Sequence, residues 1–183
     1  MNHHLPKGKP ELQEPRFINP ELLLHPNIPK PMHGTNPRTI LGDDWWNDVR
    51  QQAYAENNYC CWACGVHKSQ AKYHQWLEAH ERYRINYEHG IVSLVEITAL
   101  CHSCHNFIHD GRMTSLVNKG EMSYDKMKEI HNHGYAVLAK AGIRNLRLDA
   151  TLIAPWHKWH LVLNGKKYYS KFASYDEWME YYS

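Results

Sequence analysis

The sequence has no apolar run long enough to cross a membrane. A membrane-spanning helix needs about 18 or more consecutive apolar residues, and no segment of the 183-residue chain provides them. Residues 1–10 also lack the charged-then-apolar layout of a secretory signal peptide. We therefore expect a soluble, cytoplasmic protein with no membrane partner, built as one ordinary domain with appendages.

Proline is almost missing beyond residue 37. Eight of the nine prolines lie at or before Pro37, and each removes a backbone donor and fixes φ, so neither a helix nor a central strand is expected there. Residues 1–42 are predicted to form an extended arm. Its apolar residues predict that part of the arm lies on the body of the protein or on a partner, either a second copy or another protein: Phe17, Ile18, Leu22, Leu23 and Leu24.

A large excess of charge of one sign is also missing, since the net charge is +2. Binding to nucleic acid therefore depends on where the charge lies. Residues 142–171 contain one acid, Asp149, and six basic residues: Arg144, Arg147, Lys158, Lys166, Lys167 and Lys171. Aromatic residues alternate with these lysines, which is typical of a nucleic-acid platform and equally of the core of a small module. Both interpretations stay open.

Cysteine is confined to residues 60–104. Five cysteines in one stretch do not resemble the even framework of a small secreted fold. Cys61-Trp-Ala-Cys64 and Cys101-His-Ser-Cys104 are two CxxC pairs, and two such pairs can place four thiolates around one Zn²⁺. The sequence predicts this structural zinc site, although Cys60 could replace Cys61 as the ligand.

Capping residues, turns and apolar periodicity predict the elements around the cysteines. A helix is expected to begin at Trp45, after a cap at Asp43 or Asp44, and to continue until Asn57-Asn58 interrupts the apolar pattern. Two strands before the second CxxC pair and a helix after it make a ββα unit. The other expected elements are a helix capped by Ser123 and ending at Gly142, strands on either side of Asn164-Gly165, and a final helix around 177–181. The fold class is α+β, divided at 1–42, 43–118, 119–148 and 149–183.

A histidine pair follows the second CxxC motif. On a helix that begins at this motif, His105 and His109 are one turn apart and project from the same face, as two ligands of one metal must. Such a pair alone is more often a solvated helix face. Beside a zinc-binding motif, a metal site is the better interpretation.

Three motifs together resemble the HNH family of nucleases. They are Cys61-x2-Cys64, Leu77-Glu-Ala-His80 and Leu100-Cys-x2-Cys-His105-x3-His109. The resemblance covers residues 61–111 and implies a ββα-metal, or His-Me finger, fold built on a zinc treble clef. It also implies a metal-dependent endonuclease or nickase that hydrolyses phosphodiester bonds of DNA.

The resemblance assigns roles to five positions. The family's metal ligands fall on His80, His105 and His109, which would hold a second divalent cation: Mg²⁺, Mn²⁺, Ni²⁺ or Zn²⁺. The general-base histidine of the family falls on Glu81, and its asparagine falls on Glu96. The chain resembles in this respect a branch of HNH-like sequences from phages and bacteria that have Glu after the first histidine.

The geometry of a strand complicates the base assignment. His80 and Glu81 face opposite sides of a regular strand, whereas Glu78 shares a side with His80, so Glu81 can act only if the chain bends there. Glu96 either orients the base or is a surface acid. The lone histidines His74, His89 and His102 are further candidate ligands or proton carriers, although such residues usually lie on polar faces.

The expected partner is DNA, with RNA as an alternative. Candidate phosphate-binding residues flank the site and continue in the tail: Arg82, Arg84, Arg112, Lys158, Lys166 and Lys167. Two other functions remain open: a non-catalytic module that binds nucleic acid or protein on an HNH scaffold, and a purely structural zinc protein. The last leaves the grouping of the histidines unexplained.

Overall fold

A computed structural model describes residues 12–144 and 154–182 of the chain, so Arg147 and Asp149 of the basic region lie outside it. Within these ranges the fold is α+β, as expected, with five α-helices and one four-stranded mixed sheet. No helix of this part is long and apolar enough to cross a membrane. In chain order the elements are α1 (Pro37–Glu56), β1 (Glu78–Asn86), β2 (Ile91–Leu100), α2 (His102–Ile108), α3 (Asp110–Asn118), α4 (Tyr124–Lys140), β3 (His160–Leu163), β4 (Lys166–Tyr169) and α5 (Tyr175–Tyr182).

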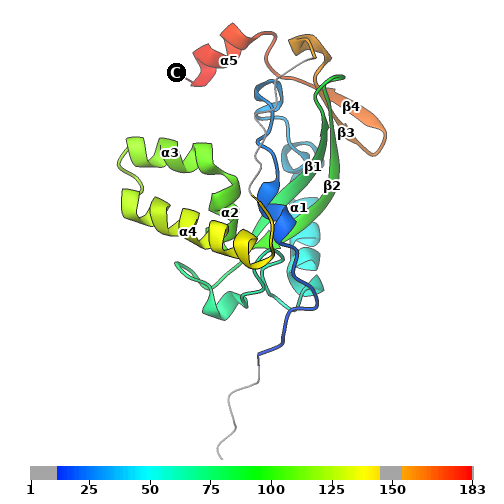
Figure 1. The fold of residues 1–183 in the computed structure, drawn as a ribbon. Coiled ribbons are helices and arrows are strands. Elements are labelled where there is room, and N and C mark those ends of the chain that lie inside the picture. Colours follow the sequence, from blue (N-terminus) through cyan, green and yellow to red (C-terminus); the bar gives the residue numbers. More distant parts are fainter. Residues whose placement is uncertain (1–11, 145–153, 183) are drawn as a thin grey trace, which may run out of the picture.

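The sheet is built on the long β1–β2 hairpin, and its strand order is β1-β2-β3-β4. β3 runs parallel to the first residues of β2, and β4 returns antiparallel to β3. Asn164 and Gly165 both have positive φ, as the predicted two-residue turn requires. The tail hairpin therefore extends the same sheet, and the boundary predicted at 148/149 lies outside the described residues. Figure 1 shows α2, α3 and α4 together on one side of this sheet.

The predicted arm contains helical turns, which corrects the expectation of a wholly extended segment. Two 3₁₀ helices form at Pro20–Leu24 and Lys30–Met32, and α1 begins at Pro37 instead of Trp45. Asn36 caps α1 by accepting a hydrogen bond from the Thr39 amide at 2.9 Å. Proline in the first turn of a helix costs no hydrogen bond, because that amide has no partner in any helix. The expected start near Trp45 follows a kink at Gly42 (φ 90°).

The arm lies on the body of its own chain. Leu22 and Leu23 are buried in the main core, and the Asn19 amide donates to the Trp62 carbonyl at 2.7 Å. The first 3₁₀ helix packs on both α2 and α4. Burying a leucine side chain contributes about 1.5–3 kcal/mol, so these contacts hold the arm against the helices.

The contact between α2 and α4 depends on a glycine. α4 begins where predicted, with the Ser123 hydroxyl accepting from the Lys126 amide at 3.2 Å. Gly134 lies in the middle of α4, where glycine is unfavourable. The ring of Phe107 on α2 occupies the space beside it, and a Cβ on Gly134 would come within 2.1 Å of that ring. The glycine lets the two helices approach each other.

We expect Gly134→Ala to destabilise the protein by about 1–3 kcal/mol, because the added methyl group overpacks a buried contact. The matched control is Gly111→Ala in α3, where nothing lies within 4 Å of the new Cβ. That change should be neutral or stabilise the helix by up to about 1 kcal/mol. Urea denaturation of both variants measures the difference, and equal midpoints would contradict the role assigned to Gly134.

Candidate metal centre

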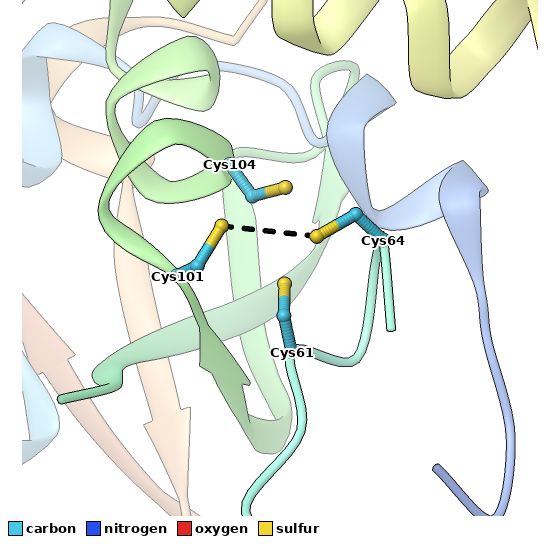
Figure 2. A group of neighbouring side chains, drawn as sticks. All are labelled: Cys61, Cys64, Cys101 and Cys104. Atoms are coloured by element: carbon cyan, nitrogen blue, oxygen red, sulfur yellow. Dashed lines mark hydrogen bonds between the residues drawn. The ribbon is translucent and has the colours of Figure 1, made fainter. Parts of the chain in front are cut away.

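Four cysteine side chains converge at the junction of β2 and α2. The ligand atoms of Cys61, Cys64, Cys101 and Cys104 all lie within 4.8 Å of one another. Figure 2 shows the four side chains pointing toward a common centre. The sulfurs of Cys64 and Cys101 are 3.8 Å apart, too far for a disulfide. Zinc–sulfur bonds of about 2.3 Å at tetrahedral angles place two sulfurs about 3.8 Å apart. The cluster can therefore hold a metal ion such as zinc.

Local backbone structure presents these thiols. The Cys61 amide donates to Val66 and its carbonyl accepts from Gly65, which closes a tight turn, and the Trp62 amide donates to Ala99 of β2. Gly65 has φ +79°, a conformation that other residues rarely adopt. The second pair starts α2, since Cys101 is its N-cap. Cys60 lies outside the cluster, with its thiol 3.6 Å from the Gln13 carbonyl. The structure thus groups Cys61, and not Cys60, with the others.

The four thiols are linked to one another through hydrogen bonds. Burial raises the pKa of Cys61, but hydrogen bonds from the three neighbouring thiols outweigh burial and lower it well below its usual value. Hydrogen bonding to Cys101 and the other thiols raises the pKa of Cys104. His133 of α4 lies 3.3 Å from the Cys104 sulfur. Only a bound cation can compensate four thiolates in this buried place.

The three predicted histidines form a second group beside the four cysteines, since His105 directly follows Cys104 in α2. His80 comes from β1, His105 from α2, and His109 from the break between α2 and α3. Their ligand atoms lie within 4.8 Å of one another, and His80 Nδ1 is 3.2 Å from His109 Nε2. Two nitrogens bound to one zinc at about 2.0–2.1 Å lie about 3.3 Å apart. We call this group the three-histidine cluster.

The three-histidine cluster favours neutral imidazoles, which are the form that binds metal. Burial, followed by repulsion from His105 and His109, lowers the pKa of His80 to about 2. Burial and repulsion from His105 lower the pKa of His109 to about 4. His80 Nε2 is buried and has no hydrogen-bond partner among the described residues.

A fourth histidine, His25 of the arm, packs against this cluster. Its ring meets the His80 ring edge-on at 5.1 Å, and its Nε2 accepts from the Tyr83 amide at 2.9 Å. This amide is available because the pairing of β1 with β2 shifts between Arg82 and Tyr83. Sequence reasoning missed His25, since only the fold brings the arm to β1.

Glu78 is the carboxylate on the histidine side of β1. One oxygen, Oε2, accepts from Nδ1 of His105, and the other, Oε1, lies 2.7 Å from His102 and 2.8 Å from His74. Burial would raise the pKa of Glu78, but hydrogen bonds from His102 and His105 hold it well below its usual value. Carboxylates that accept from the second nitrogen of a metal-binding histidine fix the orientation of its ring. Glu78 therefore leaves Nε2 of His105 free for a ligand.

Glu81 and Glu96 do not join this group. The pairing of β1 is regular from Glu78 to Arg82, so the alternation of side chains places Glu81 on the strand face opposite His80. The charge of His105 nevertheless reaches the Glu81 carboxylate. Burial raises the pKa of Glu81. Glu96 forms a half-exposed ion pair with Arg82 at 2.8 Å, which agrees with the surface-acid interpretation and occupies one predicted phosphate ligand.

The other predicted basic residues are exposed but dispersed. Arg84 and Arg112 lie on the surface, and besides burial the positive charge of Arg112 helps to lower the pKa of His109. Lys158 lies just before β3, and Lys166 and Lys167 lie in β4. Of these two strands only β3 pairs with β2, at Ile91–Ser93, whereas His80 pairs with Thr98. Five residues of strand separate these positions by about 17 Å.

A groove lies beside Glu78, and the sequence did not indicate it. It has a volume of about 330 Å³ and runs between α1 and the start of β1, where Trp46 and Trp76 supply aromatic walls. Arg38 and Arg50 of α1 also line this groove, and Arg38 forms an exposed ion pair with Asp43 at 3.0 Å. The sequence alone could not predict that these α1 residues line the groove, because α1 is brought to the sheet only by folding.

His74 and His102, two of the lone histidines, also turn out to lie at Glu78. Only the i, i+4 spacing of His74 and Glu78 hinted at this contact. His89, in contrast, contacts Asn86 at the exposed hairpin turn.

No family model, curated protein or solved structure matches the chain significantly, so any functional proposal depends on the geometry of the site alone.

We expect the purified protein to hold one zinc ion on the four cysteines, and Cys101→Ser to lose both this zinc and cooperative unfolding. Structural zinc contributes on the order of 10 kcal/mol to folding at such sites. Cys60→Ser is the matched control, because its thiol is adjacent in sequence but outside the cluster. Metal analysis combined with thermal unfolding tests this. A folded, zinc-free Cys101→Ser protein with an unchanged melting curve would rule out the zinc assignment.

Proposed function

We propose that the protein is a metal-dependent phosphodiester hydrolase of the HNH type, acting on DNA. The observation that carries this proposal is the three-histidine cluster, placed on β1 and α2 directly beside the four-cysteine site. This arrangement agrees with the ββα unit and treble clef that the sequence resemblance implies. A closed set of four cysteines suits a structural ion, whereas three histidines leave coordination positions open for substrate and water.

The donors fit a divalent cation. Burial lowers the pKa of His80 and of His109, which favours their neutral, metal-binding form, and Glu78 orients His105. A cation bound there would polarise the phosphate, stabilise the leaving oxygen and lower the pKa of the attacking water, whose proton would pass to the solvent. The chain's own contribution is to hold three imidazoles in place, to bury the His80 side chain, and to keep the Glu78 carboxylate ionised.

The groove beside Glu78 supplies a place for the sugar-phosphate backbone. Arg38 and Arg50 line it together with Trp76, which is 58% exposed. Arginine binds phosphate through two parallel hydrogen bonds, and an exposed aromatic ring can stack on a base. In this proposal the groove positions the strand, and the lysines of the tail contact phosphates farther along the duplex.

A non-catalytic nucleic-acid-binding module is the second candidate function. It is favoured by the position of Glu81, the residue at the place of the family's general base, on the strand face opposite His80. In this alternative the scaffold keeps both metal sites and the groove, but no group removes a proton from water.

Two glutamates on opposite faces of β1 provide a matched test of the hydrolase. In plasmid nicking with Mg²⁺, Mn²⁺, Ni²⁺ or Zn²⁺, we expect His109→Ala to abolish cleavage. Glu78→Gln should reduce cleavage about 10–100-fold, because it loosens the orientation of His105. Glu81→Gln should stay within about threefold of the wild type, since general-base loss would cost about 10²-fold or more.

The outcomes separate the two candidate functions. DNA binding by the wild type without nicking in any metal would support the binding module. Nicking that is lost in Glu81→Gln but kept in Glu78→Gln would contradict the roles assigned from the two faces of β1.

The tail lysines provide a test of DNA contact. If Lys166 and Lys167 each neutralise one phosphate, the double change to alanine should reduce the slope of log K against log salt by about 1.8. Lys140→Ala at the end of α4 is the control and should leave the slope unchanged. Fluorescence anisotropy with a labelled duplex at several salt concentrations measures it. Equal slopes for the double variant and wild type would restrict the tail to a packing role.

A further inference from the structure

A second group of metal-binding side chains meets on the other oxygen of Glu78. His74 Nε2 and His102 Nδ1 lie 2.8 Å and 2.7 Å from Glu78 Oε1, and 3.0 Å from each other. The three residues come from separate places: the loop before β1, the start of β1, and the first turn of α2. The fold therefore assembles this group, which we call the facial triad.

Hydrogen bonds alone do not satisfy this triangle of atoms. If both imidazole nitrogens carry a proton and donate to Glu78, two N–H groups lie side by side at 3.0 Å. If either nitrogen is bare, its lone pair faces the carboxylate oxygen or the other ring without a bridging proton. At least one of the three contacts is then unfavourable. One cation between the three atoms makes every contact favourable.

The spacing of the atoms indicates the coordination geometry. Ligands at about 2.1 Å from one ion at right angles lie about 3.0 Å apart, and octahedral ions use this arrangement. The contacts of 2.7–3.0 Å come close to it, whereas tetrahedral ligands would lie about 3.3 Å apart. Two histidines and one carboxylate on one face of an octahedron are a known ligand set that leaves the other positions open.

The surrounding side chains hold the two imidazoles in position. The ring of Trp76 stacks on His74 with centroids 3.7 Å apart and an angle of 2° between the planes. Tyr73 meets the His102 ring edge-on at 5.3 Å. The side-chain amide of Asn106 donates to the His102 backbone carbonyl at 2.9 Å and lies 3.3 Å from His102 Nδ1. This ordering lowers the entropy that the side chains lose when they bind an ion.

We propose that His74, Glu78 and His102 bind a divalent cation that prefers octahedral coordination, separate from any ion at the three-histidine cluster. Glu78 links the two sites, because its Oε2 holds His105 while its Oε1 takes part in the facial triad. Occupation of the facial triad fixes the carboxylate that orients His105. Binding at the two sites is therefore expected to be coupled, and each ion should change the affinity of the other by the same factor.

Equilibrium dialysis of the zinc-loaded full chain against Co²⁺ tests the proposal. We expect two bound Co²⁺ per wild-type chain, one in His74→Ala and one in His109→Ala. His89→Ala, which changes an exposed histidine of the β1–β2 turn, is the control and should keep two. Zinc content is measured on every sample, so that only chains with an intact four-cysteine site are compared.

The failing outcomes are specific. A single Co²⁺ in the wild type that is unaffected by His74→Ala would overturn the proposal and leave a hydrogen-bonded network only. A single ion lost in both His74→Ala and His109→Ala would show one shared site, which also overturns it. Two ions in a protein that does not cleave DNA would keep this proposal and refute the hydrolase.

A second measurement needs no change of ligand, in case His74→Ala fails to retain zinc. Co²⁺ at the facial triad should quench the fluorescence of Trp76, which stacks on His74. The quenched fraction should fall in Trp76→Phe, which preserves all three ligands, and persist in Trp46→Phe. Equal quenching in the two variants would overturn the assignment.

Discussion

The convergence of four thiols in a buried place is the constraint on which the rest of the site depends. Three of the four cysteines are buried, and they belong to the same core as Leu23, Phe107 and Ile130. The turn at Cys61 is tied to β2, and Cys101 sets the first residue of α2. As His102 and His105 lie within or just after the second CxxC pair, fixing these sulfurs also fixes where both histidines point.

Features that depend on neighbouring residues could be predicted from the sequence. The two CxxC pairs, the Ser123 cap and the Asn164-Gly165 turn all gave correct local structure. The spacing of His105 and His109 correctly indicated that they lie close together, although His109 follows the last residue of α2 instead of lying within the helix. The start of α1 was predicted too late because the prolines dominated the interpretation of the arm. Proline excludes the interior of a helix but not its first turn.

Features that depend on distant parts of the chain could not be predicted. The parallel pairing of β3 with β2 joins residues about 70 positions apart, at Ile91 and His160. The approach of His25 to His80 and of Arg50 to Glu78 likewise needs the folded arm and α1. The alternation of side chains along β1 did predict that Glu78, and not Glu81, shares a strand face with His80. The family resemblance favoured Glu81, whereas the geometry of a regular strand favoured Glu78.

The position of the arm has a consequence for the order of events during synthesis. Leu22 and Leu23 leave the ribosome early, but their contacts on α2 and α4 belong to residues 102–140, which appear much later. At a synthesis rate of about 5–20 residues per second, several seconds pass between the synthesis of the arm and that of the helices on which it packs. Its leucines are exposed for that time, so a nascent chain stalled before α4 is expected to be a target for chaperones and proteases.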